Sequence, residues 1–358
     1  MLGGIMESRK KLLRLSIATL FVLVILFSSP PVFAGGGSHV ALGQYANPMV
    51  GVSPPPGFVF TEYLSYYTAD KLKDNHGRTL SLERDGVELD RSSAYASGNS
   101  ILWISNLKIL GGFYGARFVV PVERLNTIMD AFTPFGLRHL SEGAGGVGDI
   151  YFDPLMLSWH EKHGLFHITT GVDITAPTGS YNKRRLICVG RNLWTFTPAF
   201  QFTMFFPWHP RLSLGVRVDY SFNTKNDDFV ISPGTAAKIG NMALTGLKTH
   251  ITPGQEFHFD YGIGYSLTKL DAAHQFNVGV VGYYYQQIND DKTGYGSIEK
   301  DRGQVFAVGP GVWYNHKKWN IGLQGFIETP VKFFNIIDIK TKNRPQGWFG
   351  LSTITYSF

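Results

Sequence analysis

Hydrophobic and polar residues alternate along much of this chain in segments of about 10 residues. The clearest segment spans residues 212–222, where aliphatic and aromatic residues occupy every second position and Ser213, Arg217 and Asp219 lie between them. Because successive side chains of a strand point to opposite faces, each segment predicts a strand with one apolar and one polar face. A tilted strand of about 10 residues crosses a bilayer.

Twelve such segments follow one another from residue 58 to residue 358, joined alternately by five short turns and six long polar connections. This alternation with an even strand number is typical of outer-membrane barrels, whereas a soluble sandwich does not impose it. We predict an all-β fold, a transmembrane antiparallel up-and-down β-barrel. The predicted strands are 58–67, 100–109, 114–123, 149–159, 166–176, 194–204, 212–222, 257–267, 276–285, 305–314, 319–328 and 348–358. The connections 68–93, 124–146, 177–192, 223–255, 286–303 and 329–346 are predicted to be exposed loops.

The last predicted strand ends the chain on an aromatic residue, Phe358. Trp348, Ile354 and Tyr356 share its face, and mainly hydroxyl-bearing residues occupy the other face. This strand resembles the closing strand of Gram-negative outer-membrane barrels, in which a terminal aromatic residue is the assembly signal. We therefore expect two partners, the lipid of the outer membrane and the barrel-assembly machinery, which would bind through the strand ending at Phe358.

The first 34 residues have the order of a secretory signal peptide. A basic region at residues 9–14 precedes an apolar run at residues 15–27 and a small-residue cleavage site ending at Ala34. The apolar run is shorter than the roughly 20 residues of a membrane-spanning helix. The predicted division is a signal peptide at 1–34, a Pro/Gly-rich periplasmic lead-in or plug at 35–57, and a barrel at 58–358. For residues 35–57, a disordered tail is an equal alternative to a plug.

Composition supports secretion and a barrel. The mean hydropathy is only −0.04 although 27 Phe and 17 Tyr are present, because apolar outer faces and polar lumenal faces cancel in the average. Removal of residues 1–34 takes away four basic residues and one acidic residue, so the formal charge falls from +6 to +3. No basic stripe with interleaved aromatic residues is present, and we expect no nucleic-acid partner. The single cysteine, Cys188, excludes an internal disulfide.

The polar faces of the strands define a candidate substrate path. Charged residues on the lipid face would cost about 2–4 kcal/mol each near the midplane, so they are expected in the lumen. There they either fill the interior as ion pairs or contact solute. Aromatic residues on the inner faces suit a hydrophobic solute, although Tyr285 and Trp313 fit membrane-interface anchors equally well. The candidate lumen residues are Arg117, Asp149, Asp153, Asp173, Arg217, Asp219, His258, Asp260, Tyr283, Tyr285, Trp313, Glu328, Phe349 and Leu351.

Several stretches in order along the chain resemble the phenol-degradation MetA-pathway family of predicted outer-membrane transporters. They are Gly148-Asp149 with Pro154 and Trp159, and residues 176–181, 190–198, 260–265 and 281–287. The resemblance extends over about residues 54–358. It implies a barrel for the uptake of hydrophobic or aromatic compounds, and it brings no established binding residues. We therefore predict a channel through which such molecules diffuse.

Two other functions fit a barrel of this size. An outer-membrane hydrolase needs a nucleophile, a base and a group that orients the base, and His139 and Ser141 lie in a predicted loop without a recognisable partner. A structural or adhesive barrel would act through its long loops. His160, His163 and His167 surround a short turn, but their irregular spacing favours solvated side chains over a metal site. We predict no enzyme, no metal and no cofactor.

Overall fold

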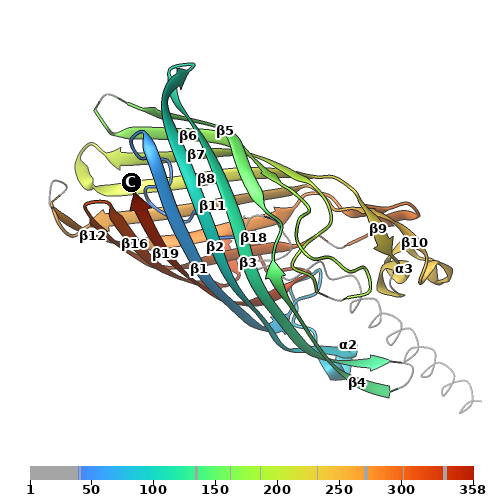
Figure 1. The fold of residues 1–358 in the computed structure, drawn as a ribbon. Coiled ribbons are helices and arrows are strands. Elements are labelled where there is room, and N and C mark those ends of the chain that lie inside the picture. The colour runs from blue at the N-terminus through green and yellow to red at the C-terminus, as the bar shows by residue number, and fades with distance from the viewer. Residues whose placement is uncertain are drawn as a thin grey trace, which may run out of the picture.

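The computed structural model describes residue 39 and residues 42–133, 136–161, 163–185, 187–231, 233–269, 273–300, 302–333 and 337–358. Among these residues, twelve antiparallel strands close into a barrel, as Figure 1 shows, and the predicted fold class is confirmed. The barrel strands are β1 (Gly57–Leu72), β2 (Val87–Ile109), β3 (Gly112–Thr133), β5 (Tyr151–His160), β6 (Phe166–Thr175), β7 (Thr195–Phe206), β8 (His209–Asn223), β11 (Glu256–Ser266), β12 (His274–Gln287), β15 (Gln304–His316), β16 (Trp319–Glu328) and β19 (Pro345–Ser357).

The first and last strands of the barrel close it. β19 pairs with β1 on one side and with β16 on the other, in the arrangement that a closing strand requires. The pairing with β1 runs from Val59 opposite Ser357 to Leu72 opposite Pro345. The N–H of Phe358 donates to the carbonyl of Phe58 at 2.9 Å, so the seam extends to the end of the chain.

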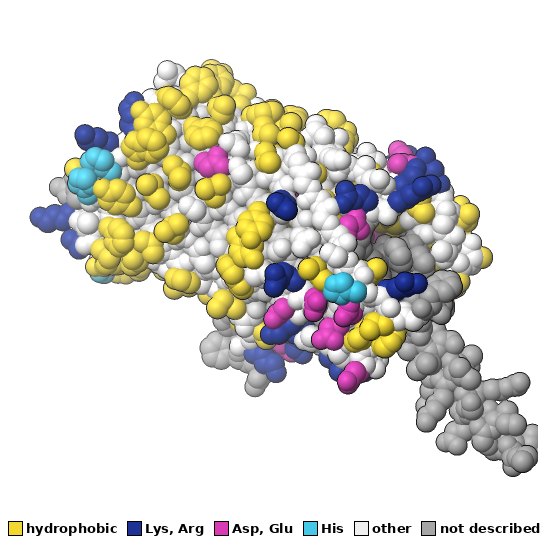
Figure 2. All heavy atoms as spheres, turned by 60° about the horizontal axis from the view of Figure 1, so that its bottom comes forward, with side chains coloured by type: hydrophobic (Ala, Val, Ile, Leu, Met, Phe, Trp, Pro, Cys, Tyr) yellow, Lys and Arg dark blue, Asp and Glu magenta, His cyan; other side chains and the backbone are white. Residues whose placement is uncertain are grey.

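The alternation of side chains separates a lipid face from a lumenal face. In β19, Trp348 is 48% exposed while the next residue, Phe349, is 1% exposed. In β3, Phe118 is 47% exposed and Arg117 is 8% exposed. Figure 2 shows hydrophobic side chains over the barrel wall and charged side chains gathered mainly toward its ends. The predicted face assignment is therefore correct for these strands.

The predicted loop at 124–146 is wrong. β3 continues to Thr133, and β4 (Gly136–Val147) returns beside it as a hairpin outside the ring of barrel strands. β2 likewise begins at Val87, well inside the predicted loop 68–93. These extensions are stable because they bury a small apolar cluster of their own, formed by Leu72, Leu80, Val87, Leu89, Met129 and Ala131.

The connections 223–255, 286–303 and 329–346 also contain regular structure, contrary to their prediction as loops, whereas the described residues of 177–192 contain no helix or strand, as predicted. Within the described residues, β9 (Asn226–Val230), β10 (Lys248–Thr252), β13 (Asp291–Thr293) and β14 (Gly296–Ile298) form a second sheet. β17 (Val331–Phe333) pairs with β18 (Ile337–Ile339). Short helices complete these connections: α2 (Leu82–Asp85), α3 (Pro233–Ile239) and the 3-10 turn η1 (Met242–Leu244). No described helix has the length and apolar character needed to cross a membrane. Residues 1–34, the predicted signal peptide, lie outside the described residues.

Candidate functional site

Residues 42–52, which we call the plug, lie inside the barrel. The N–H groups of Gly43 and Tyr45 donate to the two carboxylate oxygens of Asp260 on β11, at 3.0 and 2.9 Å. The side-chain amide of Gln324 on β16 donates to the carbonyl of Ala46 at 2.7 Å. Two strands that lie three positions apart in the barrel, β11 and β16, therefore hold the plug through its backbone, whose polar groups would otherwise be buried without partners.

Glycines on the inner face of the barrel make room for the plug. A Cβ added to Gly262 would lie 2.7 Å from the nitrogen of Pro48, and one added to Gly264 would lie 2.6 Å from Pro48 Cγ. A Cβ on Gly215 of β8 would contact the carbonyl of Asn47. No side chain fits at these positions unless the plug moves, so the three glycines form its seat.

A continuous set of ion pairs, which we call the charged wall, connects β3, β6, β8 and β11. Asp173 accepts from Arg117 and from Arg217 at 2.6 Å each, and Arg217 also lies 2.9 Å from Asp219. His258 bridges Asp219 and Asp260, with both distances 2.9 Å. The charged wall thus ends on the carboxylate that binds the plug, and its members are Arg117, Asp173, Arg217, Asp219, His258 and Asp260.

The aromatic ring of Tyr45 brings the plug directly against this wall. The guanidinium carbon of Arg217 lies 3.9 Å from the centre of the ring, and that of Arg117 lies 5.1 Å from it. Arg217 is completely buried. Cation–π contacts are strongest where water is excluded, so the plug also stabilises the charges that hold it.

Asp149 binds residues of two other motifs, 176–181 and 190–198, next to the N-terminal end of the plug. It accepts from the N–H of Gly179 at 2.8 Å, from the N–H of Arg191 at 2.7 Å and from the ring of His39 at 2.9 Å. Burial alone would raise the pKa of Asp149, but the hydrogen bonds from His39 and the backbone lower it overall. Burial lowers the pKa of His39 to about 4 although Asp149 opposes this change, so the ring is neutral at pH 7.

An apolar wall faces the charged wall across the plug. The rings of Tyr283, Phe326 and Phe349 pack in a row along it. The Tyr283 ring is tilted against that of Phe326 with centres 5.5 Å apart, and the Phe326 ring stacks on that of Phe349 with centres 5.3 Å apart. A Cβ on Gly43 of the plug would lie 3.0–3.3 Å from these rings. Buried residues of the same cluster include Val281, Tyr285, Val305, Ala307, Trp313 and Leu351.

Glu328 is the charged residue embedded in this apolar wall. Its carboxylate accepts from the hydroxyls of Tyr67 and Tyr283 at 3.0 Å each and from the N–H of Gly347 at 2.8 Å. Three donors satisfy it, so its role in the structure is to fix two tyrosine rings in the wall.

All fourteen candidate lumen residues are at most 8% exposed, and the charged members sit mostly in the wall that holds the plug. Tyr285 and Trp313 are 3% exposed, which places them inside the barrel and not among the interface anchors. Asp153 lies against Gly171, where the absence of a Cβ leaves it room. Whether these residues form a path for solute stays a prediction.

Sequence reasoning missed Phe326 and Gln324 on β16. A count in steps of two back from Glu328 places both on the lumenal face, so the signal was present in the sequence. The plug contacts of Asp260 carried no such signal, because its partners are backbone N–H groups that any residue possesses.

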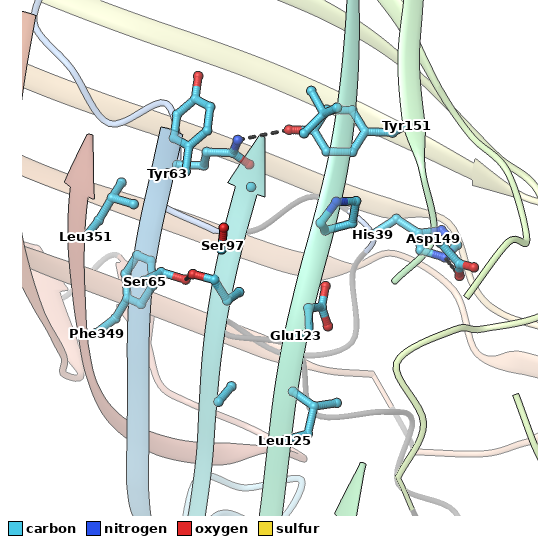
Figure 3. Close-up of a pocket in the computed structure, with 16 residues that line it drawn as sticks. His39, Tyr63, Ser65, Ser97, Glu123, Leu125, Asp149, Tyr151, Phe349 and Leu351 are labelled. Atoms are coloured by element: carbon cyan, nitrogen blue, oxygen red, sulfur yellow. Dashed lines mark hydrogen bonds and ion pairs between the residues drawn. The ribbon is translucent and has the colours of Figure 1, made fainter. Parts of the chain in front are cut away.

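Cavities remain between the plug and the barrel. One of about 650 Å³ opens at the short-turn end and is lined by Pro48, Met49, Trp313 and Trp319. A second of about 190 Å³ lies beside Tyr45, Arg117 and Gln324. A third of about 70 Å³, drawn in Figure 3, lies between the plug and strands β1, β2, β3 and β19. The lumen is therefore narrow but not completely filled.

The candidate hydrolase residues lie on the hairpin outside the ring of barrel strands, and the candidate metal residues lie at the short-turn end of the barrel, where His163 lines the cavity of about 650 Å³. His139 is on β4, not in a loop, and it does have a partner, since its Nδ1 lies 2.7 Å from Asp130 on β3. No hydrogen bond joins His139 to Ser141 within the described hairpin. His160 and His167 approach each other at 2.7 Å. The described part of the chain contains no group of three or more His, Cys, Asp or Glu that could hold a metal ion.

Comparisons with known proteins agree with the fold. A model of the family described as "Putative MetA-pathway of phenol degradation" matches residues 69–334. A crystal structure of an outer membrane channel from Pseudomonas putida F1 overlaps with a TM-score of 0.64 at 15% identity, covering 89% of this chain and 100% of that one. No curated protein sequence matches.

Weaker overlaps join this chain to two further barrels. The β domain of the Bordetella autotransporter BrkA has a TM-score of 0.44 at 12% identity, covering 85% of this chain and 100% of that domain. A TodX monoaromatic hydrocarbon channel mutant has a TM-score of 0.43 at 10% identity, covering 90% and 97%. At these TM-scores the two overlaps carry no argument about the function of this chain.

Proposed function

Because this chain belongs to the family described as "Putative MetA-pathway of phenol degradation", we propose that it is an outer-membrane channel for the uptake of hydrophobic or aromatic small molecules by diffusion. The observation that carries this proposal is the apolar wall of Tyr283, Phe326 and Phe349 beside the plug. A hydrophobic solute buries apolar surface against such a wall, whereas against the charged wall it would leave ionised side chains without water or polar partners. The proposed route therefore follows the apolar side of the lumen.

We propose that the protein lies in the Gram-negative outer membrane, which it would reach by export to the periplasm through its signal peptide and then by insertion through the barrel-assembly machinery. The barrel fold and its likeness to an outer membrane channel support this location. We propose no catalytic role. Transport by diffusion requires only a continuous apolar wall and a plug that can move aside.

Uptake of a hydrophobic solute tests the proposal. Vesicles with lipopolysaccharide in the outer leaflet, which resists hydrophobic solutes, would carry the purified barrel, and the entry of toluene would be timed. Trp313→Asp places a carboxylate on the apolar wall beside the large cavity. We expect entry to fall roughly tenfold, because about 1.4 kcal/mol of lost affinity along the wall suffices.

Trp313→Phe, which keeps an aromatic ring, is the matched variant and should retain most of the wild-type rate. Heat-dependent mobility on a gel confirms that each variant is folded. Wild-type vesicles that take up toluene no faster than protein-free vesicles would exclude the channel. Equal rates for the wild type and Trp313→Asp would exclude the apolar wall as the route.

A further inference from the structure

A carboxyl group lies on the outer face of the barrel wall. Phe58 and Leu64 of β1 are 54% and 45% exposed, and Glu62 lies an even number of positions from both, so it belongs to the same outward face. On β16, by contrast, Leu323 and Ile327 occupy outward positions and are 58% and 65% exposed. A carboxyl group on this face is costly, because the hydrocarbon of a membrane supplies no polar partner.

Two rows of aromatic side chains show the depth of Glu62. The rings of Tyr66 and Tyr95 lie 4.5 Å apart toward the long-loop end, and those of Phe58 and Trp103 lie 6.5 Å apart toward the short-turn end. Such rows mark the two membrane interfaces of a barrel. Glu62 is four residues from Phe58 and four from Tyr66, or about 13 Å along the strand from each row. It therefore lies near the middle of the hydrocarbon layer.

Two polar residues of β2 accompany Glu62 on this face. Ser97 and Asn99 alternate with Tyr95 and Ile101, which are 56% and 52% exposed. The hydroxyl of Ser97 donates to Oε1 of Glu62 at 2.5 Å, and the amide of Asn99 donates to the Ser97 hydroxyl oxygen at 3.2 Å. We call Glu62, Ser97 and Asn99 the polar patch. Within the described residues, Glu62 and Asn99 make no other side-chain hydrogen bond, so the polar patch keeps an acceptor and a donor for a further partner.

The neighbouring strand β19 leaves the surface beside the polar patch accessible. β19, β1 and β2 lie side by side (Figure 1), and Ser352 of β19 is opposite Leu64 of β1. Gly350 shares the outward face of Ser352, and a Cβ added to it would meet only the ring of Trp348, at 3.7 Å. Small residues of this kind allow a second protein surface to approach the backbone closely within a membrane.

A second copy of this chain matches the polar patch better than lipid or an unrelated protein does. All copies insert in the same orientation, so two copies are related by a two-fold axis along the membrane normal, which brings groups of equal depth together. Glu62 and Asn99 are cross-strand partners and lie at nearly the same depth. An axis passing between β1 and β2 therefore sets each carboxyl group against an amide of the other copy. Acyl chains offer no such donor.

We propose that the outer faces of β1 and β2 form an interface at which two copies of this chain pair within the membrane, with Glu62 accepting from Asn99 of the partner subunit. Polar side chains placed within a membrane usually serve a function of this kind, because their exposure to lipid is costly. The interface requires that the barrel spans a bilayer. It does not depend on solute uptake, so either proposal can fail without the other.

Counting of bleaching steps in lipid vesicles tests the interface. Each purified barrel would carry one fluorophore at His163→Cys, an exposed position, in a Cys188→Ser background, and dilution with lipid would give the dissociation constant of the pair. We expect most wild-type spots to bleach in two steps at low lipid content. Glu62→Leu should raise the dissociation constant roughly tenfold or more, because each pair loses two hydrogen bonds and the single barrel no longer exposes a carboxyl group.

Exchange of the two polar residues makes the test specific for this geometry. Asn99→Glu alone sets carboxyl against carboxyl and should prevent pairing, whereas Glu62→Asn combined with Asn99→Glu restores one acceptor and one donor on each copy and should restore pairing. Glu88→Leu, at an exposed position of β2 beyond the aromatic row, should keep the wild-type dissociation constant. Heat-dependent mobility on a gel confirms that each variant is folded.

Three results would overturn the inference. Single-step bleaching of the wild type at every lipid content would show that the barrel does not pair. An unchanged dissociation constant in Glu62→Leu would place the pairing on another face. Pairing of the exchanged double variant as weak as that of Asn99→Glu would exclude the contact between Glu62 and Asn99 of the partner subunit.

Discussion

The two walls of the lumen make different kinds of contact with the plug. The charged wall binds it through the hydrogen bonds from the N–H groups of Gly43 and Tyr45 to Asp260 and through the cation–π contacts of the Tyr45 ring. The apolar wall touches it at Gly43, through rings that make only van der Waals contact. Charge-assisted hydrogen bonds depend strongly on geometry, whereas apolar contacts tolerate sliding. Hydrogen bonds hold the plug on both sides, since Gln324 of β16 also donates to the carbonyl of Ala46. The rings of the apolar wall still leave a surface along which a solute can move.

Space remains beside both walls. The cavity of about 190 Å³ lies next to Arg117 of the charged wall, and the cavity of about 650 Å³ lies next to Trp313 of the apolar wall. The ion pairs of the charged wall have to be densely connected to offset the cost of burying them, but the plug does not fill the lumen around them.

Breaking the charged wall should have the largest effect. Arg217→Met removes the cation between Asp173 and Asp219 and leaves both carboxylates buried without it. Loss of one partner from a buried ion pair costs about 3–5 kcal/mol. We expect the free energy of unfolding, measured by urea titration in lipid vesicles, to fall by this amount.

Arg124→Met, at an exposed position of β3, is the matched control and should change the free energy of unfolding by less than about 0.5 kcal/mol. A loss no greater than this in Arg217→Met would show that the charged wall does not stabilise the barrel.

Altering the glycine seat should have a smaller effect, confined to the plug. Gly262→Ala adds a methyl carbon that would lie only 2.7 Å from the nitrogen of Pro48. Overpacking of this kind costs about 1–3 kcal/mol, and moving the plug relieves it. We expect faster hydrogen exchange in residues 42–52 and a higher ion conductance across planar bilayers.

Gly325→Ala is its control, because a Cβ at that position meets nothing within 4 Å. Unchanged hydrogen exchange and ion conductance in Gly262→Ala would mean that the glycine seat does not determine the position of the plug.

The smallest effect should come from mild acid. The pKa of His39 falls from 6.5 to about 4 when the plug is in place, so the free segment binds a proton more readily than the docked one. Docking is therefore at full strength above pH 6.5 and weakens as the pH falls toward 4, by about 1 kcal/mol at pH 5.5.

Hydrogen exchange of residues 42–52 at pH values between 7 and 5, corrected for the intrinsic pH dependence of exchange, measures this weakening. His39→Gln should remove the pH dependence, whereas His163→Gln, whose side chain is 82% exposed, should retain it. A pH dependence that survives in His39→Gln would assign it to another group.

The period-two alternation was sufficient to predict the barrel and the inner face of each strand. Each strand must present one face to lipid, so a single segment such as residues 212–222 carries the information by itself. The same rule placed Tyr283, Trp313 and Phe349 inside, and it would have placed Phe326 there as well.

The alternation could not predict which charged residues of the wall pair with one another. Asp260 lies opposite Arg217 and His258 opposite Asp219 because of the register between β8 and β11, which a connection of more than 30 residues separates. The extension of β3 into β4 was missed because it is stabilised by an apolar cluster in which Leu89 of β2 lies opposite Met129 of β3, not by contact with lipid. Neither feature has a local signature.

The hairpin of β3 and β4 has a consequence for how the molecules behave toward one another. Closing a barrel removes every free strand edge, yet this sheet ends on β4 and so keeps one. Such an edge is a template for pairing with a second chain, which leads to aggregation. Arg185 covers it, donating to Glu142 at 2.8 Å and to the carbonyl of Gly143. A single loop side chain thus occupies one backbone acceptor of this edge, the carbonyl of Gly143, that a foreign strand would need for pairing.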